Sequence, residues 1–93
     1  MENRAVYFRT ENCSVCDVLR PKLMKLFEEK YPKMEWVEFY SKTEPEKFKE
    51  YNVMVAPTLI VEFDGKETHR FLRAFSLSEV SEKIVRFYDL VFG

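Results

Sequence analysis

The chain has one histidine, two cysteines, almost no excess of either charge and no long apolar run. A closed zinc site needs four ligands. With only His69, Cys13 and Cys16 present, such a site would have to be shared between subunits. Lysine and arginine number 15 against 16 acidic residues, a net charge of −1, which argues against a nucleic-acid-binding surface. No apolar stretch approaches the length that spans a membrane. We therefore expect neither a nucleic acid nor a membrane among its partners.

The chain also lacks the pattern of a signal peptide, any internal repeat, any low-complexity segment and any linker. The first four residues lead directly into an expected strand, so we expect a cytoplasmic protein. In the reducing cytosol a cysteine pair is more often catalytic than structural. A hydrophobic fraction of 46% favours a globular fold. We expect a single, monomeric domain over residues 1–93, a length that suffices for one core.

Apolar patterning predicts four strands, at residues 5–9, 34–40, 58–63 and 67–72. Between the first two strands a helix is expected to run from the cysteine pair to Tyr31-Pro32, where proline ends it. Its apolar residues recur at helical spacing and predict one buried stripe, made of Val15, Val18, Leu19, Leu23, Leu26, Phe27 and Tyr31.

Two capping boxes place the other helices. Thr43-x-x-Glu46 predicts a short helix to Tyr51, and Ser76-x-x-Glu79 predicts the start of the last helix. Asp64-Gly65 between the last two strands is a strong signal for a tight hairpin. The order is thus β-α-β-α-β-β-α. A helical crossover makes the first two strands parallel, so we expect an α/β fold with a four-stranded mixed sheet and helices on both faces.

Cys13-Ser14-Val15-Cys16 lies where the first strand passes into the first helix. Cys13 faces the unpaired N–H groups and the positive end of that helix, which favour a thiolate. A thiolate attacks disulfides, and the second cysteine then resolves the mixed disulfide. This spacing predicts a redox pair, with Cys13 attacking and Cys16 resolving. Half of a shared zinc site and two inert buried thiols are the alternatives.

Several motifs in this order resemble the thioredoxin superfamily over nearly the whole chain. They are Cys13-Ser14-Val15-Cys16, Pro21 five residues past the second cysteine, Ala56-Pro57-Thr58 before the third strand, and Asp64-Gly65 in the hairpin. The resemblance implies a minimal thioredoxin-like fold with a cis proline at Pro57, beside the cysteine pair. It also implies that an extended substrate lies against Val55 and Ala56. We accordingly assign to substrate binding Asn12, Val55, Ala56, Pro57 and Phe75.

The chain departs from the thioredoxin pattern at several places. Ser14-Val15 stands where thioredoxins have Gly-Pro, Asn12 where they usually have Trp, and Ala74 where they have a groove-lining glycine. Glutaredoxins share the minimal core, but residues 71–75 contain no Gly-Gly pair of the kind that helps to hold glutathione.

The resemblance also points to a change beneath the cysteines. Where thioredoxins carry a buried carboxylate and a neighbouring lysine, this chain has Tyr7 and Glu38. A Glu38 buried under Cys16 would have a raised pKa and could accept a hydrogen bond from Tyr7. Such a group would take the proton from the resolving thiol, so Glu38 joins the cysteines as a catalytic candidate.

Together these features predict a thiol–disulfide oxidoreductase acting on protein disulfides and served by an upstream reductase. The cysteines carry the electrons, so no metal or other cofactor is expected. One alternative is a glutaredoxin-like, glutathione-dependent reductase. A second is a metal carrier, although those have a β-α-β-β-α-β order, and the third is a thioredoxin-fold adaptor without turnover.

Overall fold

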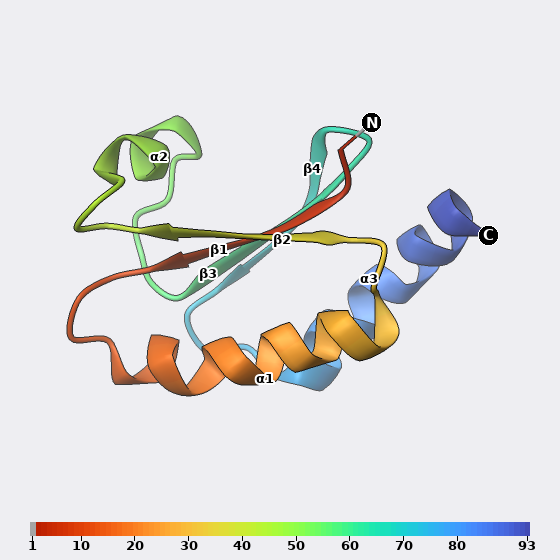
Figure 1. Cartoon of the computed structure of the whole chain (residues 1–93), viewed down its shortest axis with the longest axis horizontal. Coiled ribbons are helices and arrows are strands. Elements are labelled where there is room, and N and C mark those ends of the chain that lie inside the picture. The colour runs from red at the N-terminus through yellow and green to blue at the C-terminus, as the bar shows by residue number, and fades with distance from the viewer. Residues whose placement is uncertain (1) are drawn as a thin grey trace.

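The computed structural model describes residues 2–93 and contains four strands and three helices in the expected order (Figure 1). The elements are β1 (Arg4–Arg9), α1 (Ser14–Lys30), β2 (Glu35–Tyr40), α2 (Pro45–Glu50), β3 (Thr58–Phe63), β4 (Lys66–Leu72) and α3 (Leu77–Phe92). Within these residues no helix is both long and apolar enough to cross a membrane.

The strands form one mixed sheet in the order β2-β1-β3-β4. β1 and β2 are parallel, and β3 runs antiparallel to both β1 and β4. The turn between β3 and β4 has positive φ at Asp64 (55°) and Gly65 (77°), as a two-residue hairpin turn of type I′ requires. The predicted hairpin and the parallel pairing of the first two strands are therefore confirmed.

Each face of the sheet has its own core because strand side chains alternate. Ala5 and Tyr7 of β1 belong to the larger cluster, which α1 and α3 cover. Val6 and Phe8 belong to a smaller cluster, against which Phe48 of α2 packs. Figure 1 shows α1 and α3 below the sheet and α2 above it. The predicted placement of helices on both faces of the sheet is confirmed.

The helix starts agree with the sequence in one case and not in the other. Ser76 caps α3, with its Oγ accepting the Glu79 N–H at 3.1 Å. The prediction that a capping box at Thr43 starts α2 is wrong. The helix begins at Pro45, and its N-cap residue, Glu44, makes no side-chain capping hydrogen bond. Proline is favoured in the first turn of a helix, where its missing N–H costs nothing, and here it decides the start.

The buried stripe of α1 also differs from the predicted one at its beginning. Cys16, Leu23 and Phe27 are buried, whereas Val15 and Val18 are 55% and 59% exposed. Neighbouring helical residues point about 100° apart, and in this first turn it is Cys16 that faces the sheet. Val15 and Val18 are left on the open side of the helix, next to the cysteine pair.

Candidate active site

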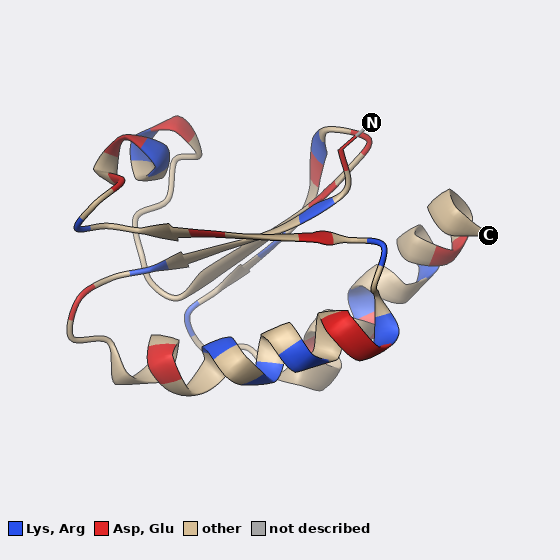
Figure 2. Cartoon of the chain, in the orientation of Figure 1, with Lys and Arg blue, Asp and Glu red and all other residues tan. Residues whose placement is uncertain are grey.

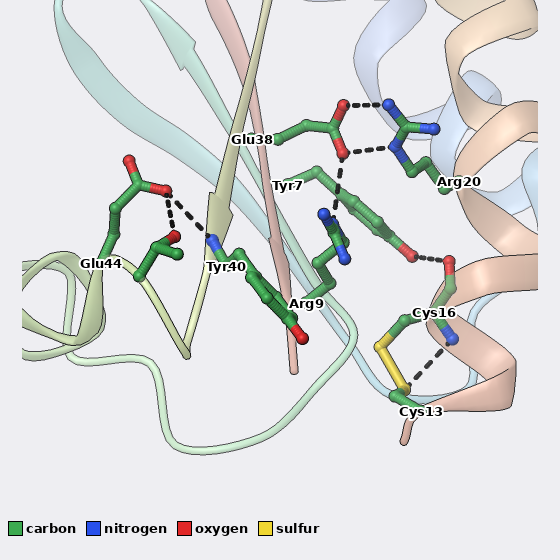
Figure 3. A network of polar contacts seen from close by, with 9 residues as sticks. Tyr7, Arg9, Cys13, Cys16, Arg20, Glu38, Tyr40 and Glu44 are labelled. Carbon is green, nitrogen blue, oxygen red and sulfur yellow. Dashed lines mark hydrogen bonds and ion pairs between the residues drawn. A yellow bond between two sulfur atoms is a disulfide. The ribbon is translucent and has the colours of Figure 1, made fainter. Parts of the chain in front are cut away.

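Cys13 and Cys16 form a disulfide at the start of α1 (Figure 3). Cys13 is the N-cap residue, with extended backbone angles, and its Sγ accepts the N–H of Cys16 at 3.1 Å. Its carbonyl oxygen accepts the N–H of Asp17, also at 3.1 Å. The sulfur of Cys13 therefore occupies the place that a serine or aspartate oxygen usually takes at a helix N-terminus, where backbone donors stabilise negative charge.

The two cysteines differ in their access to solvent. Cys13 is partly exposed, while Cys16 is 0% exposed and lies on the sheet side of α1. A thiol must be reachable to attack a large substrate, and a shielded thiol can react only with a partner already brought next to it. The burial pattern fits the order in which Cys13 attacks and Cys16 resolves.

Pro57 follows a cis peptide bond with Ala56, as the resemblance implied. It is buried, and its carbonyl oxygen accepts the N–H of Arg73 at 2.8 Å. A surface hollow of about 420 Å³ lies between this segment and the start of α1. Its lining residues are Asn12, Cys13, Ser14, Val15, Ala56, Pro57, Arg73 and Ala74.

The structure thus brings together Cys13, Asn12, Ala56 and Pro57 from two distant parts of the chain. Phe75 lines a second hollow beside the first and packs on Phe71 at 5.7 Å between ring centroids. Val55 lines neither hollow, and its carbonyl oxygen accepts the Thr58 hydroxyl at 2.7 Å.

Glu38 has partners other than the predicted one. Its two carboxylate oxygens accept Nε and Nη2 of Arg20, at 2.5 and 2.8 Å, and Nε of Arg9 lies 3.7 Å from Oε1. The Tyr7 hydroxyl instead donates to the Cys16 carbonyl at 2.9 Å. In Figure 3 the Tyr7 ring lies between the Glu38–Arg20 pair and the disulfide. The predicted Tyr7–Glu38 hydrogen bond is wrong.

The electrostatics of Glu38 also contradict the prediction of a raised pKa. Partial burial alone would raise it, but the hydrogen bonds from Arg20 and the charges of Arg20 and Arg9 outweigh burial and hold the pKa below its ordinary value. A carboxylate so held is a weak base, so the basis for a proton-accepting role is lost. Burial, followed by the negative charge of Glu38, raises the pKa of Tyr7 to about 12. Tyr7 therefore stays a neutral donor to the Cys16 carbonyl.

Arg73 is a site residue that the sequence did not reveal. It has φ of 58°, a left-handed backbone that bulky side chains rarely adopt. Glycine adopts this backbone conformation freely, and in this chain it is found at Arg73, directly before the Ala74 that the resemblance placed at the groove-lining position. The one sequence signal for this segment was its position just before the Ser76 cap, which does not indicate a left-handed residue.

Among residues 2–93, no group of three or more histidine, cysteine, aspartate or glutamate side chains gathers where it could hold a metal ion. The helix α2 lies between β2 and β3, and this order differs from the β-α-β-β-α-β order of the metal-carrier alternative.

Comparison with known proteins agrees with this geometry. The family model for thioredoxin matches residues 2–86. Thioredoxin 1 from the thermophilic eubacterium Thermosipho africanus TCF52B has a similar structure, with a TM-score of 0.84 and 28% identity over 94% of this chain and 96% of that one. Fasciola hepatica thioredoxin gives 0.80 and 29% over 91% and 80%. A search of curated proteins gives no match.

The oxidised thioredoxin O2 of Arabidopsis thaliana shares the fold at 18% identity, with a TM-score of 0.82 over 94% of this chain and 76% of that one. The fold is thioredoxin-like, with the expected strand order and helices. Because the family model spans nearly all of the chain and the cysteines form a close pair after β1, the chain belongs to the thioredoxin family and is a protein-disulfide oxidoreductase.

Proposed function

We propose that Cys13-Ser14-Val15-Cys16 is the redox centre with which this chain reduces protein disulfides. The observation that carries the proposal is the pairing of a partly exposed Cys13, which lines a hollow bounded by Pro57, with a fully buried Cys16 directly behind it. We further propose that this activity resides in one domain made of the whole chain, acting as a monomer.

In the reduced protein the N-terminus of α1 stabilises Cys13 as a thiolate. The Cys16 N–H that meets Cys13 Sγ at 3.1 Å in the disulfide form is one donor to that negative charge, and the positive end of the helix dipole adds to it. Cys16 stays a neutral thiol, because burial disfavours its charged form.

The reaction has two exchange steps. The Cys13 thiolate attacks one sulfur of the substrate disulfide, which breaks the substrate S–S bond, forms a mixed disulfide and releases a substrate thiolate. Cys16 then loses its proton and attacks Cys13 Sγ. This forms the Cys13–Cys16 disulfide and frees the second substrate sulfur. The released thiolates take the Cys16 proton and one from water, so the substrate gains two electrons and two protons.

The substrate segment is proposed to lie in extended form along Val55 and Ala56, in contact with Asn12, Pro57 and Phe75. Ala56 and Pro57 line the same hollow as Cys13, which supports this placement. The disulfide form of the protein must be reduced again by a dithiol reductant, and an upstream reductase is the expected donor.

Trapping the mixed disulfide tests the assigned roles. Cys16→Ser should accumulate a covalent complex with a peptide disulfide through Cys13, because the second step is blocked. Cys13→Ser is the matched control and should trap none. Mass spectrometry under non-reducing conditions measures both. Trapping by Cys13→Ser, or equal alkylation rates of the two thiols in the reduced protein at neutral pH, would overturn the assignment.

A further inference from the structure

The two hollows next to Cys13 form one groove. They share Ser14, Val15, Arg73 and Ala74 in their linings. The first, of about 420 Å³, contains Cys13 at its edge, and the second, of about 290 Å³, extends along α1 to Lys22. We call the two together the α1 groove. It lies between α1 and the segment that connects β4 to α3.

The α1 groove carries positive charge and no negative charge. Arg73 and Lys22 line it, and within residues 2–93 no acidic side chain does. Both are exposed, and neither forms an ion pair with any other residue that the structure describes. Asp17 in the first turn of α1 lines neither hollow, and Glu11 pairs with Lys42 at 3.9 Å. Figure 2 shows basic positions on both elements that flank the groove.

This lack of partners sets Arg73 apart from most arginines of the chain. Four others pair with glutamates, namely Arg4, Arg9, Arg20 and Arg70. Arg73 also has the left-handed φ of 58°, while its N–H is bonded to the Pro57 carbonyl. Glycine adopts this conformation without a steric cost. Arg73 is thus a bulky residue in a backbone conformation that such residues rarely adopt, and it lies beside the substrate hollow. Residues with unfavourable backbone angles are found most often at functional sites.

We propose that the α1 groove selects protein disulfides whose attacked cysteine is followed or preceded closely by an aspartate or glutamate. This rests on the proposed function of Cys13. The occupant is an extended segment of the partner protein, with apolar contact to Val15 and Val18 and its carboxylate facing Arg73 or Lys22. Cys13 and Lys22 are separated by roughly 13 Å along the helix at 1.5 Å per residue. An extended chain covers that distance in about four residues, so the acid lies within that range of the cysteine.

Paired peptide substrates test this selectivity. Two peptides carry the same mixed disulfide and differ only in having either two glutamates or two glutamines within four residues of the cysteine. For each peptide we measure the second-order rate constant of reduction by the reduced protein and divide it by the rate constant of reduction by dithiothreitol. This ratio corrects for differences in the intrinsic reactivity of the two peptide disulfides. The wild-type protein should favour the acidic peptide about two- to five-fold at low salt, as exposed ion pairs allow, and less at 1 M salt.

Variants assign the preference to its residues. Arg73→Gly, which suits the left-handed backbone, and Lys22→Met should each reduce the ratio of the two rate constants, and the double variant should bring it to about one. Arg73→Lys should retain most of it. Lys30→Met is the control, since it removes the same charge from an exposed position at the far end of α1 and should leave the ratio unchanged.

The outcomes separate this proposal from the proposed function. A wild-type protein that reduces both peptides at equal normalised rates, or a preference that survives in the double variant, overturns the groove selectivity while Cys13 reactivity stands. Reduction of neither peptide overturns both.

Discussion

Replacing Glu38 with glutamine should lower the free energy of unfolding by about 1–2 kcal/mol at pH 7. Glu38 is 21% exposed and takes two hydrogen bonds from Arg20, with Arg9 3.7 Å away. Hydrogen bonds to a charged group contribute about 1.5–3 kcal/mol when shielded, whereas exposed ion pairs contribute about 0.2–1 kcal/mol. Because Arg20 is 42% exposed, the expected loss lies between these ranges. Glutamine also removes the negative charge that lies between the guanidinium groups of Arg9 and Arg20, so the two positive charges are no longer compensated.

The loss should depend on pH in a definite direction. The arginines hold the pKa of Glu38 in the folded protein below its ordinary value of 4.5. A group with a depressed folded pKa stabilises the protein fully above its unfolded pKa, and this contribution disappears as the pH falls through the folded pKa. The gap between wild type and Glu38→Gln should therefore be constant from pH 6 to 8 and should narrow progressively below about pH 4.5.

Urea denaturation of the disulfide form at several pH values measures this gap. Glu50→Gln is the matched control. Glu50 is 58% exposed, and Lys47, at 3.4 Å, is its one ion-pair partner among residues 2–93, so the effect should stay below about 0.5 kcal/mol. A Glu38→Gln protein as stable as wild type at pH 7 would refute the bidentate pairing with Arg20. A gap that widens on acidification would refute the depressed pKa.

Three further predictions follow from the site and its supports. Tyr7→Phe keeps the ring but removes the donor to the Cys16 carbonyl, so it should cost about 1 kcal/mol of unfolding free energy, measured by urea denaturation; an unchanged midpoint would contradict it. Ser14 offers a hydroxyl, and Val15 keeps an N–H that proline lacks. Both donors stabilise the Cys13 thiolate and hence the reduced form, so the reduction potential should be less negative than the about −270 mV of thioredoxin. Equilibration with glutathione measures the potential, and a more negative value would contradict the prediction. Ser76→Ala should cost about 1 kcal/mol through the lost N-cap of α3, and calorimetry should show a lower Tm.

The features that sequence alone determined are those set by residues close together in the chain. The apolar runs, the Asp64-Gly65 turn and the Ser76 cap specify strands, hairpin and helix through local backbone preferences. They were enough to predict the element order and the mixed sheet. The cysteine pair at the start of a helix is equally local, because the N–H groups that face Cys13 belong to the same turn.

Tertiary structure alone decided which side chains meet across the chain. Glu38 and Arg20 are 18 residues apart. Nothing in the order of residues shows that the carboxylate pairs with this arginine of α1 and not with Tyr7 of β1. Helical periodicity placed Val15 on the buried stripe, but the docking of α1 on the sheet turned Cys16 inward instead. Arg73, with its left-handed backbone, likewise donates its N–H to the carbonyl of Pro57, which is distant in the sequence. The residue pattern along the chain shows which face of a helix or strand is apolar. The packing of helices against the sheet then fixes how each helix is rotated about its axis, and this determines which charged side chains meet.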